Sequence, residues 1–239
     1  MSCFIQNIGI FSFAFASLYF AGLGPSFILL STAQKRQSFL LAPVMGICFL
    51  TLIGLFQITI LLVPFTPLAN ISALLLISLC VCLFSRNAFQ RAWVKFRLTL
   101  GWVWLLPILL ILVFSWMFHN DGLHLLVGGS DQLQYCENAR QILEKMHTDS
   151  LLDIPVARQQ YFVYEVITRT LPYIKGYRRG AELMLATTAA VTGLSYQAAF
   201  PVIVLNVLLT LGLVMGLIGR FFLRRSCFYT FLLQLIFIS

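Results

Sequence analysis

The chain has 239 residues, of which 60% are hydrophobic and only 10% are charged. Soluble globular domains carry about 25% charged residues, so this composition excludes an ordinary soluble protein and predicts a membrane protein. The formal net charge is +8. All acidic residues lie within 119–182 and the rest of the chain carries only basic charge. We therefore attribute the basic excess to membrane topology, and we expect no nucleic-acid partner.

Long apolar stretches predict an all-α, polytopic membrane protein with five transmembrane helices and a partial sixth. A span needs about 20 apolar residues, because the hydrocarbon core is about 30 Å thick and a helix rises about 1.5 Å per residue. The third stretch is the shortest of the five full spans. The last one stops at the end of the chain, which indicates a truncated span and a fragment of a longer protein. The stretches are 8–31, 38–63, 68–84, 98–118, 200–223 and, for the partial span, 227–238.

These stretches divide the chain into two regions. Residues 1–97 form an N-terminal membrane region with three spans. Residues 98–239 hold the fourth span and an external loop of about 60 residues that contains helices. The second region comprises the span 98–118, the loop 119–182, a short helix 182–192, the span 198–223 and the truncated span 227–239.

Basic clusters predict the orientation of the chain. They lie at 32–37, 85–97 and 220–226, after the first, third and fifth predicted spans. Cytoplasmic loops are enriched in Lys and Arg. We therefore expect these three segments in the cytoplasm, and the N-terminus and the 119–182 loop on the other side. The expected location is the inner (plasma) membrane of a bacterium.

The external loop begins with a predicted amphipathic helix. Apolar residues recur at helical spacing over 131–147, after the glycines at 128 and 129. Asp131 stands at the start of this helix, and Tyr135 follows one turn later on the same face. Capping of the helix N-terminus is the simpler interpretation of Asp131.

A basic and aromatic segment, 173–180, leads back to the membrane. Anchoring at the headgroup level is the simpler interpretation, because Tyr and Arg are common there. The functional interpretation is capture of a phosphate by Arg178 and Arg179, since a guanidinium group matches phosphate in a bidentate way. Arg158 and Glu165, in the middle of the loop, are further candidates for substrate binding, as are Tyr135 and Glu182.

The apolar segment 182–192 is too short to span a membrane. Gly193 can end a helix and Ser195 can cap the next one. The sequence therefore predicts a short helix that lies in, or dips into, the outer interface. Glu182 at its start is expected to face water or a site, and not lipid.

The order of these segments resembles the first external loop of GT-C-type glycosyltransferases. The resemblance covers about 98–223 and rests on Gly-Gly-Ser-Asp131-Gln-Leu-Gln-Tyr135-Cys-Glu-Asn-Ala139 and on the later Gly180-Ala-Glu-Leu-Met-Leu-Ala. It implies transfer of a sugar from a polyprenyl-phosphate carrier on the non-cytoplasmic face. Asp131 would then be the catalytic acid residue, as general base or metal ligand, with Tyr135 and Ala139 packing its helix. Gln132 stands where the family has a second acid, so a divalent metal cofactor stays an open question.

Two other functions stay open on the sequence alone. One is a transporter or channel subunit, although the spans lack the buried charges that usually mark ion routes. The other is a non-catalytic membrane partner whose loop docks a protein or a lipid headgroup, a role that an inactive fragment of an enzyme can also take. The bilayer and a polyprenyl-phosphate-sugar donor are the expected partners, and the sequence assigns no protein partner.

Overall fold

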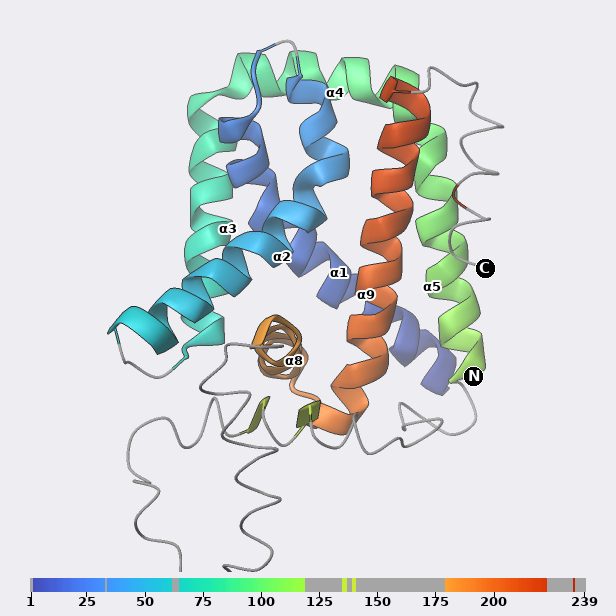
Figure 1. Cartoon of the computed structure of the whole chain (residues 1–239). Coiled ribbons are helices and arrows are strands. Elements are labelled where there is room, and N and C mark those ends of the chain that lie inside the picture. Colours follow the sequence, from blue (N-terminus) through green and yellow to red (C-terminus); the bar gives the residue numbers. More distant parts are fainter. Residues whose placement is uncertain are drawn as a thin grey trace, which may run out of the picture.

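The computed structural model is all-helical over the part of the chain that it describes, as the sequence predicted. The helices form a bundle, with one helix across one end and a short helix near the other (Figure 1). The structure describes residues 2–32, 34–61, 65–118, 135–136, 139–140, 179–222 and 234.

Apolar segments form the long helices, and two of these end in a short π-helical turn. In chain order the helices are α1 (Ser2–Leu29), α2 (Ser38–Phe56), α3 (Pro67–Phe84), α4 (Arg86–Leu100), α5 (Leu105–Met117), α8 (Arg179–Thr192) and α9 (Tyr196–Leu217). The π-helical turns follow α2, at Gln57–Leu61, and α9, at Ile218–Phe222. Short 3₁₀ turns lie at Lys35–Gln37 and Gly101–Trp104.

Four helices of the described part are long and apolar enough to cross a membrane. They are Cys3–Leu29, Lys35–Phe56, Pro67–Phe84 and Tyr196–Arg220. These helices coincide with the first, second, third and fifth predicted spans. The chain therefore has the character of an integral, multi-pass membrane protein.

The fourth predicted span, 98–118, is not one continuous helix. Its first residues belong to α4, the turn Gly101–Trp104 follows, and α5 has only 13 residues. A helix of that length is about 20 Å long, short of the hydrocarbon thickness. The predicted count of five spans and a partial sixth is therefore not confirmed. The sixth stretch, 227–238, lies outside the described residues except for Gln234.

The basic segments gather at one end of the bundle. The turn Lys35–Gln37, helix α4 and Arg220 at the end of α9 all lie there, and α4 runs across this end (Figure 1). Helix α4 is amphipathic: Ala92 and Phe96 are buried, whereas Arg91 and Lys95 are exposed. The described residues of the three basic clusters lie at one end of the bundle, which agrees with their positions in the sequence after the first, third and fifth predicted spans. That this end faces the cytoplasm stays a prediction.

Helices α1 and α2 approach closely because small residues line their crossing. A Cβ atom on Gly22 would overlap the backbone of Ala42 and Gly46, and one on Gly46 would overlap the Leu18 carbonyl oxygen. Small residues four positions apart are typical of helix pairs in membranes, where close packing has to supply the association energy. This contact was not among the predictions from the sequence.

Helix α3 supports α1 at a proline. Pro25 lacks an N–H group, so the Ala21 carbonyl has no donor from the next turn. The Ser78 hydroxyl of α3 donates to that carbonyl at 3.4 Å, and the Gly24 N–H donates to Ser78 Oγ at 2.8 Å. A serine from a neighbouring helix thus satisfies backbone groups that a proline disturbs inside a membrane helix.

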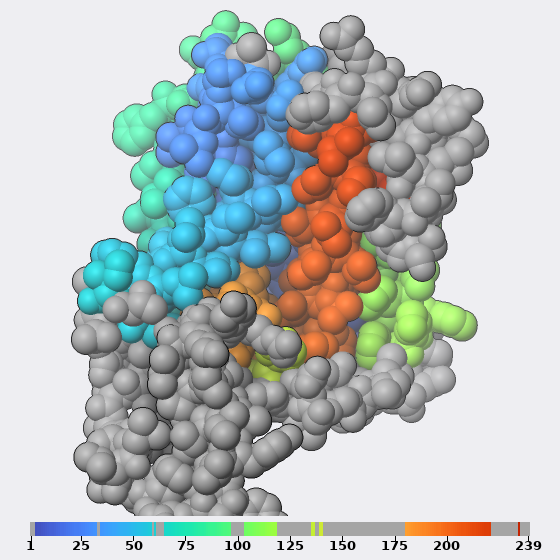
Figure 2. All heavy atoms as spheres, viewed as in Figure 1, coloured from blue at the N-terminus to red at the C-terminus, as the bar shows by residue number. Residues whose placement is uncertain are grey.

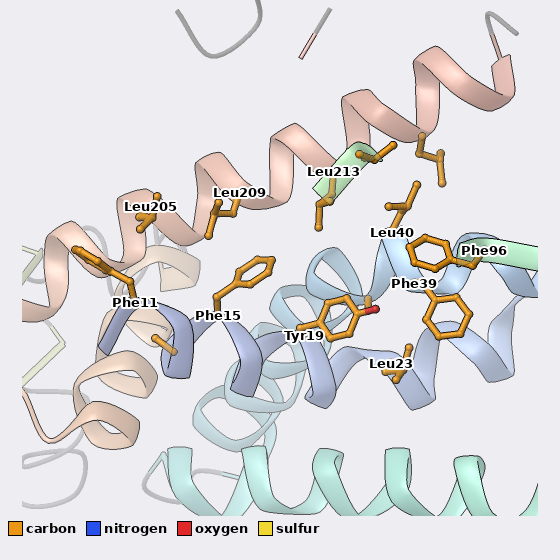
Figure 3. Close-up of a cluster of buried hydrophobic side chains, with 14 of the residues drawn as sticks. Phe11, Phe15, Tyr19, Leu23, Phe39, Leu40, Phe96, Leu205, Leu209 and Leu213 are labelled. Carbon is orange, nitrogen blue, oxygen red and sulfur yellow. The ribbon is translucent and has the colours of Figure 1, made fainter. Parts of the chain in front are cut away.

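The largest buried cluster joins α1, α2, α4 and α9. Phe11 and Phe15 of α1 lie beside a row of leucines on α9 that includes Leu205 and Leu209, and Phe39 of α2 continues the cluster (Figure 3). Edge-on ring contacts are frequent here, as the aromatic quadrupole favours. This cluster packs α9 against α1. The short helix α8 directly precedes α9 in the chain.

Candidate functional site

Helix α8 includes two of the predicted site residues, Arg179 and Glu182. It lies near the end of the bundle opposite the basic segments, where it is seen nearly end-on in Figure 1. It contacts α1, α2, α3 and α9. On the face shown in Figure 2 it appears only as a small patch between α2 and α9.

Burial distinguishes α8 from an interfacial helix. Every residue from 182 to 189 is buried, which covers more than two turns and therefore every face of the helix. A helix lying at an interface keeps one face in contact with lipid and the other with water. The prediction of a short helix over this segment is confirmed, but its residues pack inside the bundle.

Glu182 is the acidic residue in the first turn of α8, and only 6% of its surface is exposed. The helix N-terminus favours a negative charge, because the backbone N–H groups there point toward it. The side chain does not face lipid, as the sequence predicted, but burial rules out the open contact with water that was the other part of that expectation. A buried carboxylate in a membrane protein is expensive and is usually functional.

The ends of α8 follow the local signals in the sequence. Gly193 has a φ of +69°, the left-handed conformation that ends a helix, and its N–H donates to the Ala189 carbonyl at 2.9 Å. The Ser195 hydroxyl accepts from the Ala198 N–H at 3.3 Å and caps α9. Both predicted roles, for Gly193 and for Ser195, are confirmed.

A short segment of the 119–182 loop packs on α8. Cys136 and Ala139 are buried in a cluster with Leu183 and Ala186 of α8, and Tyr135 packs against that cluster. Burial raises the pKa of the Cys136 thiol, so it stays protonated and unreactive near neutral pH. The two sequence segments that carry the resemblance, around 135–139 and around 180–186, thus lie together.

Glycine at position 54 permits this packing. A Cβ on Gly54 of α2 would come within 2.9 Å of the Leu183 side chain and 2.8 Å of the Phe65 ring. The close approach places α2 directly against the first turns of α8. This second contact could not be predicted from the sequence, because a lone glycine in an apolar stretch carries no distinctive signal.

Most of the other predicted site residues fall outside the described part of the chain. These are Asp131, Arg158, Glu165 and Arg178. Arg179 is the first residue of α8. The described residues therefore place Tyr135 against the cluster that includes residues of α8, and Glu182 in the first turn of that helix. The position of the proposed catalytic Asp131 stays a prediction.

The polar residues that the sequence shows inside the spans have different surroundings. Gln57 and Asn70 exchange side-chain hydrogen bonds of 3.1 Å and 2.8 Å, so they join the end of α2 to α3. Asn206 of α9 is 4% exposed, and its Oδ1 atom has no hydrogen-bond partner among the described residues. It borders a space of about 20 Å³ beside Thr187 and Thr188 of α8, enough for about one water-sized group.

Metal-binding geometry is not found in the described part: no three His, Cys, Asp or Glu side chains of those residues gather there. Comparison of the chain with known protein families, with curated proteins and with solved structures gave no match.

Proposed function

We propose that this chain acts on a lipid-phosphate-linked sugar at the bundle end that holds α8, as a glycosyltransferase of the GT-C type. The observation that carries the proposal is the meeting of the 135–139 segment with α8 in one buried cluster. The two segments are separated by about 40 residues, and they are the segments on which the resemblance rests. Their contact supports a position for the predicted helix of Asp131 near the end of the bundle that buries Glu182.

The chemistry needs a carboxylate near the headgroup of the carrier. In the proposed reaction a carboxylate takes the proton of an acceptor hydroxyl, whose oxygen attacks the anomeric carbon of the sugar. The bond from that carbon to the carrier's phosphate oxygen breaks, and the lipid phosphate leaves. We assign the base role to Asp131. Arg178 and Arg179 offset the charge of the leaving phosphate.

Glu182 is assigned a positioning role. It is buried at the start of α8, and α8 packs against the segment that follows Asp131. In this proposal the Glu182 carboxylate holds the first turn of α8 in position. It thereby positions Arg178 and Arg179, which precede Glu182 in the chain. We expect substitution of Glu182 to lower the turnover of sugar transfer through geometry, without removing the base.

The test is sugar release by the full chain in lipid nanodiscs that contain undecaprenyl phosphate carrying a radiolabelled hexose or pentose. Water is the acceptor hydroxyl in this assay, so transfer of the sugar to water moves the label from the lipid phase to the aqueous phase. General acid–base catalysis contributes about 10²–10⁴-fold, so Asp131→Asn is expected to slow release by that factor. Asp153→Asn, the same change elsewhere in the loop, serves as the matched control.

Two results would overturn the proposal. One is release by the unaltered chain at the rate of empty nanodiscs. The other is equal release by the Asp131→Asn and Asp153→Asn variants. If cells that need the chain for growth are also rescued fully by Asp131→Asn, the non-catalytic membrane partner becomes the better explanation.

A further inference from the structure

A second feature lies toward the basic end of the bundle: a cavity of about 590 Å³ with an aromatic lining. The cavity is lined by residues of several helices, among them Phe15, Tyr19 and Phe20 of α1, Phe39 of α2 and Trp93 of α4. A volume between about 300 and 1,000 Å³ is typical of sites for small molecules. The cavity belongs to the other end of the fold from the site around α8.

The shape of the cavity suits a chain that runs along α1. Lining residues from Phe15 to Leu23 cover two turns of this helix, about 12 Å along its axis. Rings of the lining pack against one another: the ring centres of Phe39 and Phe96 are 4.9 Å apart, and those of Tyr19 and Trp104 are 5.4 Å apart. Figure 3 shows Tyr19 between Phe15 and Leu23, with its hydroxyl directed toward Phe39.

The cavity opens to the surroundings past two large side chains. Phe20 is 52% exposed and Trp93 is 45% exposed, whereas Phe15, Phe39 and Tyr19 are buried. Phe20 lies on a membrane-spanning helix, so this opening faces the bilayer. Tryptophan is enriched at the level of the lipid headgroups, where Trp93 would mark the upper rim.

Basic residues lie on the elements next to that opening. Helix α4 exposes Arg86 and Arg91, and Lys35 Nζ lies 4.5 Å from the centre of the Phe27 ring. Phe27 in turn contacts the lining residue Phe89, at 5.7 Å. Every acidic residue of the chain lies within 119–182, so α1 to α4 carry no acid to balance these charges. An amphipathic helix with a basic face and Trp and Phe on its other face binds anionic lipid surfaces.

We propose that this cavity holds one acyl chain of an anionic glycerophospholipid, whose phosphate headgroup lies against α4 and Lys35. The apolar slot along α1 takes the chain, which enters from the bilayer past Phe20. The basic rim supplies the preference for an anionic headgroup over a zwitterionic one, because each Lys or Arg near the membrane surface adds attraction to anionic lipid. The site is separate from the proposed catalytic end and does not depend on it.

The test is native mass spectrometry of the full chain released from nanodiscs with equimolar phosphatidylglycerol and phosphatidylcholine. The unaltered chain is expected to retain one phosphatidylglycerol. Ala16→Trp places an indole in the cavity, since Ala16 lines it, and is expected to lose the retained lipid. Ala73→Trp makes the same change on the exposed face of α3 and is expected to keep it. Ala16→Leu fills less space and serves if Ala16→Trp does not fold, as judged by gel filtration.

The charge part of the proposal has its own variants. Lys35→Gln with Arg86→Gln is expected to reduce the preference for phosphatidylglycerol by about 30-fold, roughly fivefold for each basic residue. Lys145→Gln with Arg169→Gln removes the same charge from the external loop and is expected to leave the preference unchanged.

Three results would overturn the proposal. The first is equal lipid retention by the Ala16→Trp and Ala73→Trp variants. The second is retention of phosphatidylcholine as strongly as phosphatidylglycerol by the unaltered chain. The third is a dimer mass that Ala16→Trp abolishes, which would show that a second copy of the chain fills the cavity.

Discussion

Gly22 offers the sharpest test of the helix packing. At the crossing of α1 and α2, a Cβ atom at this position would overlap the Ala42 carbonyl oxygen and the Gly46 nitrogen. Both obstructing atoms are backbone, so no side chain can rotate away. Gly22→Ala is therefore expected to push α1 and α2 apart. Gly9, on the same helix, provides the matched control, because a Cβ atom added there would meet nothing within 4 Å.

The size of the effect follows from two opposing terms. Overpacking costs about 1–3 kcal/mol, and a clash with backbone belongs at the upper end of that range. Replacing glycine by alanine inside a helix stabilises the fold by about 0.5–1 kcal/mol. We expect Gly22→Ala to lower the free energy of unfolding by about 2 kcal/mol. Gly9→Ala keeps only the second term, so it is expected to be neutral or slightly stabilising.

Unfolding by sodium dodecyl sulfate in mixed micelles measures this difference. Trp93 and Trp104 report on the transition, because Trp93 contacts Phe39 and Trp104 contacts Tyr19 in the core next to the crossing. The midpoint is expected to fall for Gly22→Ala and not for Gly9→Ala. Equal midpoints for the two variants would refute the proposed contact between α1 and α2.

Three further predictions test other parts of the fold. Ser78→Ala leaves the Ala21 carbonyl without its donor and is expected to cost about 1–3 kcal/mol of unfolding free energy in the same micelle titration, whereas Ser72→Ala on the exposed face of α3 costs little. In a cysteine-free chain, Gln90→Cys on α4 should react with an impermeant thiol reagent only from the cytoplasmic side, and Gln197→Cys at the start of α9 only from the other side; the reverse pattern would overturn the orientation. Lysine placed singly over 183–189 should reduce the yield of folded protein at every position, and tolerance at every third or fourth position would show that α8 lies at an interface.

Much of the fold was predictable because membrane spans are long and their composition is simple. A run of about 20 apolar residues leaves the backbone few options, since every N–H and C=O group needs an internal partner in hydrocarbon. Helices α1, α2, α3 and α9 follow from that rule. The gathering of the basic segments at one end follows from their spacing along the chain.

The segment 98–118 shows where this reasoning fails. The segment is apolar and long enough to span a membrane. These two criteria do not show whether the chain continues straight or changes direction within the segment. Helix α4, with Ala92 and Phe96 buried, continues through Leu100, and the turn Gly101–Trp104 then leads into α5. Amphipathic periodicity over 86–97 was the signal that a helix precedes this turn.

The site was predictable only in its local features. The end of α8 at Gly193 and the cap at Ser195 depend on neighbouring residues, so the sequence contained the necessary information. The burial of α8 depends on residues far away in the chain, such as Gly54 of α2, and no local pattern indicates them. The same holds for the aromatic cavity, because its lining comes from α1, α2, α4 and the turn Gly101–Trp104.

The burial of α8 also decides how the proposed site has to be tested. Glu182 stands on a helix that four other helices enclose, so a change in its volume disturbs the fold as well as the chemistry. Glu182→Gln keeps the shape and removes the charge, whereas Glu182→Ala also leaves a cavity that costs stability. If Glu182→Gln unfolds at the same detergent concentration as the unaltered chain but releases sugar more slowly, the loss arises from the carboxylate. If both variants lose stability in parallel with sugar release, the residue serves the packing of α8 alone.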